Sequence, residues 1–91
     1  MAHLQKNKAR LMARVRRIAG QMAAIETAID QDADCAAVLQ QVAGARGALN
    51  GLMGELIEDH VREHVARPGL DAAARAAGAE ELIAVVRRYA K

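Results

Sequence analysis

A lone cysteine and a pair of histidines are the residues of this chain whose types and spacing best suit metal binding. His60 and His64 are four residues apart, a spacing that places two imidazoles on one face of a helix, where both can bind one ion. Cys35, the only cysteine, lies on the same helical stripe but roughly 37 Å from His60 along the helix. Because a metal–ligand bond is only about 2.0–2.3 Å long, these side chains can share an ion only across two chains.

The same spacing predicts how two chains pair. An antiparallel pair of these helices, crossing near residues 48–49, brings Cys35 of one subunit beside His60 and His64 of the other. That arrangement makes two equivalent sites per dimer. We therefore predict an oligomer whose ligand sites lie between its subunits.

The beginning of the chain supplies further donors. His3 lies close to the α-amino group that Ala2 gains once Met1 is removed. One thiolate, two or three imidazoles and an amine form a mixed nitrogen and sulfur set that suits Ni(II), Co(II) or Zn(II). Five or six donors favour Ni(II) or Co(II) over tetrahedral Zn(II), whereas Cu(I) would use more sulfur.

Cysteine and histidine also serve hydrolytic catalysis, which is the competing interpretation. It needs a nucleophile, a base, an orienting group and a substrate cleft. Glu63 or Asp59 could orient a histidine, but a helical chain of 91 residues offers little pocket and no oxyanion loop. We predict that the protein is not an enzyme.

The first 20 residues carry six cationic side chains and no acidic one, although the whole chain has a net charge of only +2. Such a basic segment is either a solvated face or the contact surface for an acidic partner, of which nucleic acid is the commonest. The sequence shows no helix-turn-helix and no aromatic residues for stacking on single strands. Phosphate contacts and the shape of double-stranded DNA would then supply binding. The candidate DNA-binding residues are Lys6, Lys8, Arg10, Arg14, Arg16, Arg17 and, on the dimer stripe, Arg46.

Composition and periodicity predict an all-α chain. The apolar residues are mostly aliphatic, and Tyr89 is the only aromatic one, which is typical of helices. Apolar positions spaced by three and four predict helices over Leu4–Ile29, Cys35–Ala66 and Ala73–Tyr89. Glycines inside the second helix, in 3-4-3 spacing, either let another helix backbone approach closely or mark a loop around residues 44–54. The unbroken apolar periodicity favours the helix. These glycines are Gly44, Gly47, Gly51 and Gly54.

The length of the chain and of its apolar runs limits which classes of protein it can belong to. We expect a single domain over residues 1–91, stabilised by oligomerisation because its aliphatic core is thin. No apolar run approaches the 18 or so residues of a membrane span, and the basic start lacks the apolar part of a signal peptide. One cysteine cannot form an intrachain disulfide. We therefore expect a cytoplasmic protein with no membrane partner.

Four stretches of the chain form a recognisable set. They are Arg14-Val15-Arg16-Arg17-Ile18-Ala19-Gly20-Gln21, Cys35 with Val38-Leu39-Gln40-Gln41-Val42-Ala43, Arg46-Gly47-Ala48-Leu49-Asn50-Gly51-Leu52-Met53, and His60-Val61-Arg62-Glu63-His64. Together they resemble the CsoR/RcnR family of bacterial repressors over essentially the whole chain. The resemblance implies a three-helix subunit, an antiparallel four-helix-bundle dimer core and a tetramer built as a dimer of dimers. It also implies an apo form that binds operator DNA and releases it when an effector occupies the cysteine site.

The branches of that family differ at the ligand positions. The nickel/cobalt branch (RcnR-like, DmeR-like) carries His, Cys, His and His, which His3, Cys35, His60 and His64 match. The copper branch has a second cysteine at the position of His64, and the persulfide branch also needs one. The formaldehyde branch (FrmR-like) is similar at Cys35 and His60 but has proline in place of Ala2 and an acidic residue in place of His64.

The sequence thus predicts a repressor that binds operator DNA in the apo form and releases it on binding Ni(II) or Co(II), with Zn(II) a further ion that the ligands accommodate. Cys35, His60, His64 and His3 are the predicted ligands, with the Ala2 amine as a further donor. One alternative is a formaldehyde-responsive repressor that uses Cys35 and the N-terminal amine. The other is a metal-binding helical oligomer without a DNA function.

Overall fold

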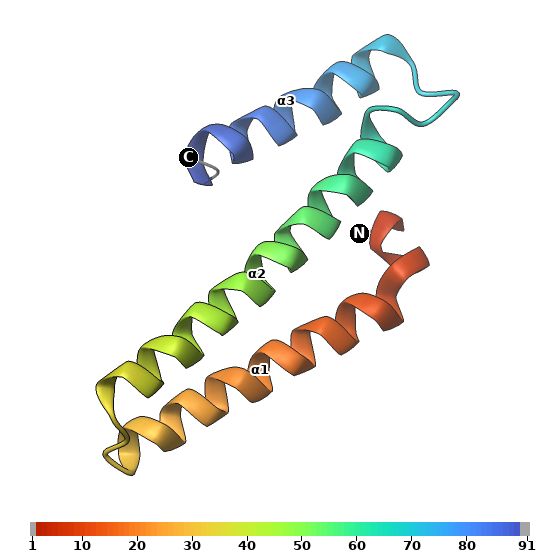
Figure 1. The fold of residues 1–91 in the computed structure, drawn as a ribbon. Helices are drawn as coiled ribbons and strands as arrows, with labels where there is room; N and C mark the ends of the chain where they lie inside the picture. The colour runs from red at the N-terminus through yellow and green to blue at the C-terminus, as the bar shows by residue number, and fades with distance from the viewer. Residues whose placement is uncertain (1, 90–91) are drawn as a thin grey trace. The chain divides into compact units, whose positions relative to one another are not determined.

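A computed structural model describes the backbone of residues 2–89 and the side chains of residues 5–89. Its elements are a short 3₁₀ helix, η1 (Ala2–Asn7), and three α-helices, α1 (Lys8–Asp30), α2 (Cys35–His64) and α3 (Ala72–Tyr89) (Figure 1). The described residues form no β-strand, which confirms the predicted all-α, three-helix chain. None of the described helices is both long and apolar enough to span a membrane.

The helix boundaries differ from the predicted ones at four ends, one of which is the end of α1 at Asp30, one residue later than predicted. The first α-helix begins at Lys8 and not at Leu4, because Asn7 occupies its N-cap position with non-helical dihedral angles, and Asn favours caps over helix interiors. α2 ends at His64, two residues earlier than predicted, where the amide of Ala66 bonds the carbonyl of Val61 five residues back. α3 begins at Ala72, one residue earlier than predicted.

The turn between α1 and α2 ends the first helix with a hydrogen-bond pattern known as the Schellman motif. The amide of Ala33 donates to the carbonyl of Ala28, and the amide of Asp32 donates to the carbonyl of Ile29. Asp32 has a φ of 58°, the left-handed conformation that this motif requires and that glycine adopts most easily. Asp34 follows, and its carbonyl accepts the first hydrogen bond of α2 from Val38.

The chain consists of two compact units, and α2 contributes to both. The α1–α2 unit is Asn7–Met53; the α2–α3 unit contains the described residues from Gly54 onwards and the η1 residues up to Lys6.

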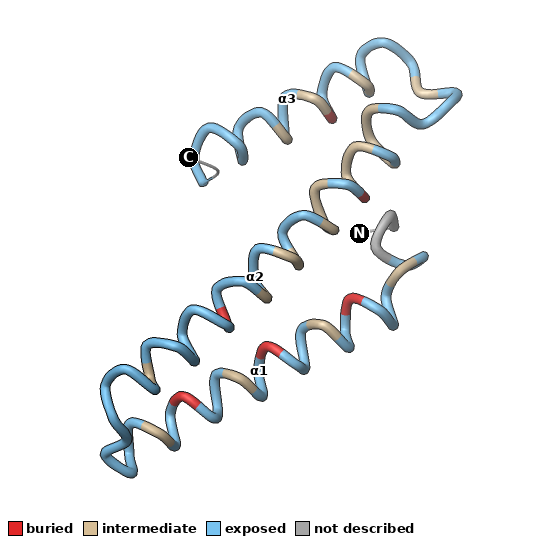
Figure 2. The backbone as a smooth tube through the Cα atoms, viewed as in Figure 1, coloured by how far each residue is buried: buried red, intermediate tan, exposed pale blue. Residues whose placement is uncertain are grey.

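In the α1–α2 unit, α1 packs against α2 through one row of side chains at heptad spacing. Leu11, Ile18 and Ile25 are buried in α1, and Ala45 is buried in α2. Figure 2 shows the three buried positions of α1 on the side that faces α2. A spacing of seven residues keeps a row of side chains on one face over several turns. This row forms the core of the unit.

A second apolar row beside this core stays exposed in the single chain. In α1, Val15 is 43% exposed, Met22 is 51% exposed and Ile29 is 61% exposed. In α2, Leu39, Val42 and Met53 of the predicted dimer stripe are exposed, and so is Leu49 beside that stripe. The predicted α1 stripe therefore divides into a row that packs inside the chain and a row that does not. We call the exposed set, Val15, Met22, Ile29, Leu39, Val42, Leu49 and Met53, the open apolar face.

The glycines of α2 lie within a continuous helix, so the alternative of a loop around residues 44–54 is wrong. Within the described residues, no other backbone comes close to these glycines. The reason is that α1 packs against a different row of α2, the one that contains Ala45. A Cβ added at Gly44, Gly47 or Gly54 would meet nothing within 4 Å, and at Gly51 it would meet only the side chain of Arg14.

In the α2–α3 unit, α3 returns beside the end of α2 after a turn that contains Gly69, with a φ of 89°. Asp71 caps α3, because its Oδ1 accepts a hydrogen bond from the amide of Ala74 at 2.7 Å. Arg75 reaches back to the carbonyls that end α2 and form the turn, those of Val65, Arg67 and Leu70. A cation at the C-terminal end of a helix is stabilised by the helix dipole, so Arg75 fastens α3 to the end of α2.

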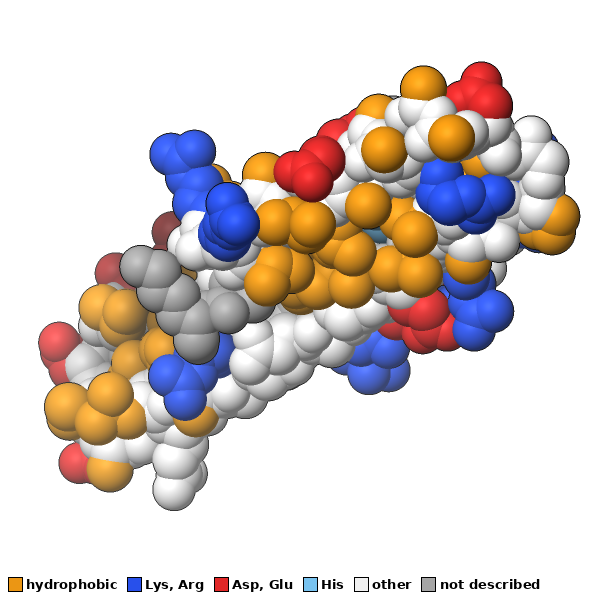
Figure 3. All heavy atoms as spheres, turned by 90° about the horizontal axis from the view of Figure 1, so that it is seen from above, with side chains coloured by type: hydrophobic (Ala, Val, Ile, Leu, Met, Phe, Trp, Pro, Cys, Tyr) orange, Lys and Arg blue, Asp and Glu red, His pale blue; other side chains and the backbone are white. Residues whose placement is uncertain are grey.

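Hydrophobic side chains also stay exposed on α3. Ile83, Val85, Val86 and Tyr89 are each exposed. In the space-filling view of the molecule, hydrophobic side chains cover a broad central area of the face shown, with charged side chains at its margins (Figure 3). So much exposed apolar area on a small chain is typical of a surface that another subunit covers.

Candidate effector site

The two histidines of the predicted site lie in the last two turns of α2, on neighbouring positions of one helix face. The ring centroids of His60 and His64 are 4.9 Å apart, and the rings are tilted by 46°. That separation is small enough for one nitrogen of each ring to bind a common ion at about 2.0–2.1 Å. The structure therefore brings this pair together as the sequence predicts.

The ring of His60 is oriented by α3. Its Nε2 lies 2.8 Å from the carbonyl oxygen of Gly78. A carbonyl can only accept a hydrogen bond, so Nε2 carries the proton and donates it. In the neutral ring the lone pair is then on Nδ1, the nitrogen that would bind a metal. A backbone carbonyl bonded to the other ring nitrogen is the usual partner of a metal-binding histidine.

His64 is held by the same residue of α3. Gly78 is buried, and a Cβ built on it would lie 2.8 Å from both the carbonyl carbon and the Cβ of His64, and closer still to the carbonyl oxygen. Only a glycine leaves room for α3 to approach the last turn of α2 this closely. Gly78 thus accepts a hydrogen bond from His60 through its carbonyl. It also lies directly against His64, because it has no side chain.

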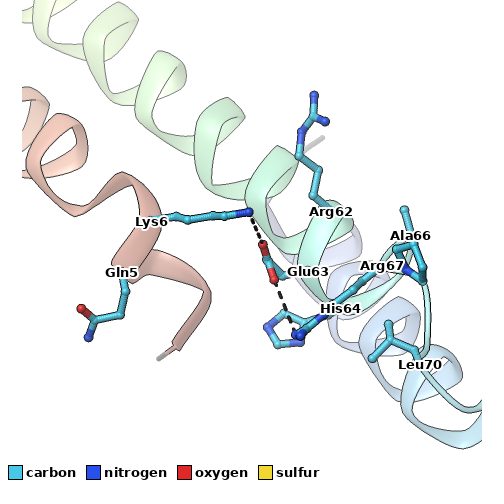
Figure 4. A pocket seen from close by; sticks show the side chains of 9 residues that line it. Gln5, Lys6, Arg62, Glu63, His64, Ala66, Arg67 and Leu70 are labelled. Carbon is cyan, nitrogen blue, oxygen red and sulfur yellow. Dashed lines mark ion pairs between the residues drawn. The ribbon is translucent and has the colours of Figure 1, made fainter.

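A cavity of about 740 Å³ opens beside His64 and is lined by residues of η1, of the end of α2 and of the turn that follows (Figure 4). Glu63 lies in its wall with a side chain 23% exposed, and its carboxylate is 4.0 Å from the Nζ of Lys6 and 3.8 Å from Arg67. Lys6 belongs to η1, the element that also contains residues 2 and 3. Gln5 and Lys6 of η1 therefore line the same cavity as His64.

The other predicted ligands lie elsewhere in the chain or outside the described side chains. Cys35 is exposed in the first turn of α2, in the unit that does not contain the histidines. The side chains of His3 and Ala2 lie outside the described residues. Over the described residues, no group of three or more His, Cys, Asp or Glu side chains could hold a metal ion.

The predicted DNA-binding residues differ in their surroundings. Arg14 is half-buried, whereas the other six are exposed, namely Lys6, Lys8, Arg10, Arg16, Arg17 and Arg46. Another exposed cation, Arg62, is held by a 2.7 Å hydrogen bond to Glu58. That bond and the charge of Glu58 raise the pKa of Arg62.

Sequence reasoning missed two residues that shape the site. In the sequence Gly78 only interrupts the Ala-rich run at the start of the third predicted helix, and no pattern gives a role to Arg75. Glycine inside a helix costs roughly 1 kcal/mol relative to alanine, which is a signal that a backbone approaches closely. The residue that it approaches cannot be read from spacing, because α3 and α2 are joined by a turn whose course the sequence does not specify.

Comparisons with known proteins agree on one family. Residues 7–88 match the model of the metal-sensitive transcriptional repressors. The transcriptional repressor RcnR of Salmonella arizonae is 42% identical over 91 residues, which is the full length of both chains. An uncharacterized protein in the bioA 5' region of Serratia marcescens is 46% identical, again over both full lengths.

A solved structure is similar in fold as well as in sequence. It is a variant of the formaldehyde-responsive regulator FrmR of Salmonella enterica serovar Typhimurium, with 40% identity and a TM-score of 0.86 over 92% of this chain and 94% of that one. In that variant a glutamate has been replaced by histidine at residue number 64, the number that His64 has here.

Proposed function

The chain belongs to the metal-sensitive transcriptional repressor family, and from that premise we propose that it is a repressor released from operator DNA by Ni(II) or Co(II). The family consists of transcriptional repressors and not of enzymes, and its members bind DNA. Which effector acts on this chain, and through which residues, is the part that we propose. The observation that carries the proposal is the pair of histidines, His60 and His64, whose rings are 4.9 Å apart at the end of α2.

The donor set fits a divalent metal of borderline softness. We propose that His60 and His64 of one subunit bind the ion together with Cys35 of another, and that His3 and the Ala2 amine complete the site. Two imidazoles on one helix face and a thiolate are ligands that Ni(II), Co(II) and Zn(II) accept. The bound ion would supply the bonds that join the N-terminal segment to the end of α2.

The open apolar face supports the assembly that this site requires. Seven aliphatic side chains beside the α1–α2 core are exposed in the single chain, from Val15 in α1 to Met53 in α2. Covering each would contribute about 25 cal/mol for every Å² removed from water. We propose that a second chain covers this face in an antiparallel four-helix dimer and that two dimers form the tetramer.

Effector and operator are then coupled through the N-terminal segment. Lys6 and the predicted donors share η1, and the basic residues continue into α1. Recruiting His3 and Ala2 to the metal would displace this basic segment from DNA. By linkage, DNA must weaken metal binding by the same factor, typically worth about 1–3 kcal/mol.

A titration tests the effector. A fluorescent duplex taken from the region upstream of the protein's own gene would be bound to the apo protein and titrated separately with Ni(II), Co(II), Zn(II) and formaldehyde. We expect Ni(II) and Co(II) to release the DNA at low dose. Release by formaldehyde alone would contradict the proposal, and an apo protein without salt-dependent DNA affinity would contradict the repressor function.

Formaldehyde is the second candidate effector, favoured by the similarity to the FrmR structure. Cys35 and the amine of Ala2 would then react with the aldehyde, and His64 would take no part. His64→Glu separates the candidates, because it removes an imidazole donor and leaves Cys35 and the amine in place. We expect it to weaken the metal response far more than any formaldehyde response; equal losses would contradict the role given to His64.

A further inference from the structure

The guanidinium of Arg14 extends from α1 across the bare backbone of Gly51 in α2. A Cβ added at Gly51 would lie 2.7 Å from Nη1 of Arg14 and 3.7 Å from its Cζ. Both residues belong to the α1–α2 unit. Arg14 follows Leu11 by three residues and precedes Ile18 by four, so it lies in the row that packs against α2, which explains why it is half-buried.

This position sets Arg14 apart from the other candidate DNA contacts. Arg14 lies in the core row between buried Leu11 and Ile18, and its guanidinium reaches α2 beside Gly51, as the charged ends of long cationic side chains do at apolar seams. The neighbouring glycine Gly47 has nothing within 4 Å of an added Cβ. The side of α2 that Arg14 reaches is therefore open, and its path to that side passes over Gly51.

We propose that Gly51 is a positioning residue for DNA binding, because the absence of a side chain there lets Arg14 lie across α2 with its guanidinium fixed in the direction of the phosphates. This inference rests on the proposed function, in which Arg14 contacts DNA. An arginine held in one orientation loses less conformational entropy when it binds a phosphate than a freely rotating one. Gly51 thus raises DNA affinity without touching DNA.

Gly51→Ala tests the inference without threatening the fold. The added methyl group meets only the far end of a flexible side chain, so Arg14 can move aside, while alanine improves helix propensity. Gly47→Ala is the matched control, since it makes the same change one turn away in open space. We expect Gly51→Ala to lower the DNA affinity of the apo protein about threefold, and Gly47→Ala to leave it unchanged, as phosphate contacts are weakened only in the first.

Two further readouts separate positioning from a general structural effect. Metal affinity and thermal unfolding are expected to stay at or above their wild-type values in Gly51→Ala. The slope of log affinity against log salt concentration is expected to become shallower by a fraction of the roughly 0.9 that complete loss of one phosphate contact gives, because the displaced guanidinium occupies its contact for less of the time. An unchanged affinity and slope in Gly51→Ala would overturn the inference.

Combining Gly51→Ala with Arg14→Ala tests whether the loss of DNA affinity comes from Arg14. In the Arg14→Ala background we expect Gly51→Ala to have no further effect on DNA affinity, because the side chain that Gly51 positions is gone. A further loss in that background would overturn the inference while leaving the repressor function intact. If Arg14→Ala alone leaves DNA affinity unchanged, the DNA contact assigned to Arg14 under the proposed function fails, and the inference fails with it.

Discussion

In the α2–α3 unit, α3 is held to the end of α2 by contacts with backbone atoms, whereas in the α1–α2 unit the helices meet through rows of side chains. Arg75 bonds three carbonyls, and Gly78 lies against the backbone of His64. The α1–α2 unit instead packs one apolar row and leaves a second one exposed. Backbone contacts fix the two histidines within a single chain, while the unit that contains Cys35 keeps an exposed apolar surface, which we propose that a second chain covers.

The two units make different contributions to the proposed metal site. The α2–α3 unit orients His60 and His64 in the folded chain. Binding an ion therefore costs less conformational entropy than it would with freely rotating histidines. The α1–α2 unit supplies an exposed thiol and the face on which subunits would pair. Substitutions in the α2–α3 unit should therefore disturb the histidines of each chain, whereas substitutions on the open apolar face of the α1–α2 unit should disturb assembly.

The largest effect is expected from a charge on the open apolar face. Met22→Asp would place a carboxylate in the proposed dimer interface, and an uncompensated buried charge costs about 3–5 kcal/mol. We expect sedimentation to show monomers for this variant and the proposed tetramers for the wild type. Ala24→Asp, which places the same charge at an exposed position of α1, is expected to leave assembly intact. A wild-type assembly in Met22→Asp would mean that this face is not the interface.

The next largest effect is expected at Gly78. In Gly78→Ala the new methyl group would meet the backbone of His64, and relieving such overpacking typically costs about 1–3 kcal/mol. We expect a lower unfolding temperature and weaker Co(II) binding, since α3 must move away from both histidines. Gly20→Ala, in open space on α1, is the control and should unfold at or above the wild-type temperature. Unchanged Co(II) affinity in a folded Gly78→Ala would show that α3 does not position the histidines.

Arg75 should give a smaller loss. Arg75→Ala removes a cation bonded to the carbonyls at the end of α2, an interaction worth up to about 2 kcal/mol when partly buried. Denaturant unfolding would measure it. Arg87→Ala removes the same charge from an exposed position in the last turn of α3, and should cost less. Equal losses of stability in the two variants would mean that the lost charge matters and that the hydrogen bonds of Arg75 to the turn do not.

The smallest effect is expected in the turn of the α1–α2 unit and has the opposite sign. Asp32 adopts a φ of 58°, which glycine tolerates without the cost that a Cβ brings. Asp32→Gly is therefore expected to stabilise the protein by about 0.5–1 kcal/mol in denaturant unfolding. The same substitution at Asp30, within α1, should destabilise it by a similar amount. A loss of stability in Asp32→Gly would show that the aspartate side chain contributes more than its strained backbone costs.

Much of the fold follows from the sequence because helices are local. The periodicity at Leu11, Ile18 and Ile25 and the i,i+4 pair of His60 and His64 need only the geometry of one helix, and both are confirmed. The position of Gly78 against His64 depends on the turn and on the packing of α3, which no local pattern specifies. The Gly51 contact was missed for a related reason, since it depends on which row of α1 faces α2.

The most direct test of the proposed function mixes two inactive variants. Cys35→Ala and the double variant His60→Ala, His64→Ala would each lack the site as pure proteins, and Co(II) would show no thiolate absorption in either. After the two are unfolded together and refolded, a mixed dimer has one site in which all three ligands are intact. The proposed site between subunits predicts that thiolate absorption returns to about a quarter of the wild-type value, because about half of the dimers in an equal mixture are mixed and each of these has one of its two sites intact. Co(II)-dependent DNA release is expected to return with it. No recovery in a mixture shown to contain mixed dimers would contradict it.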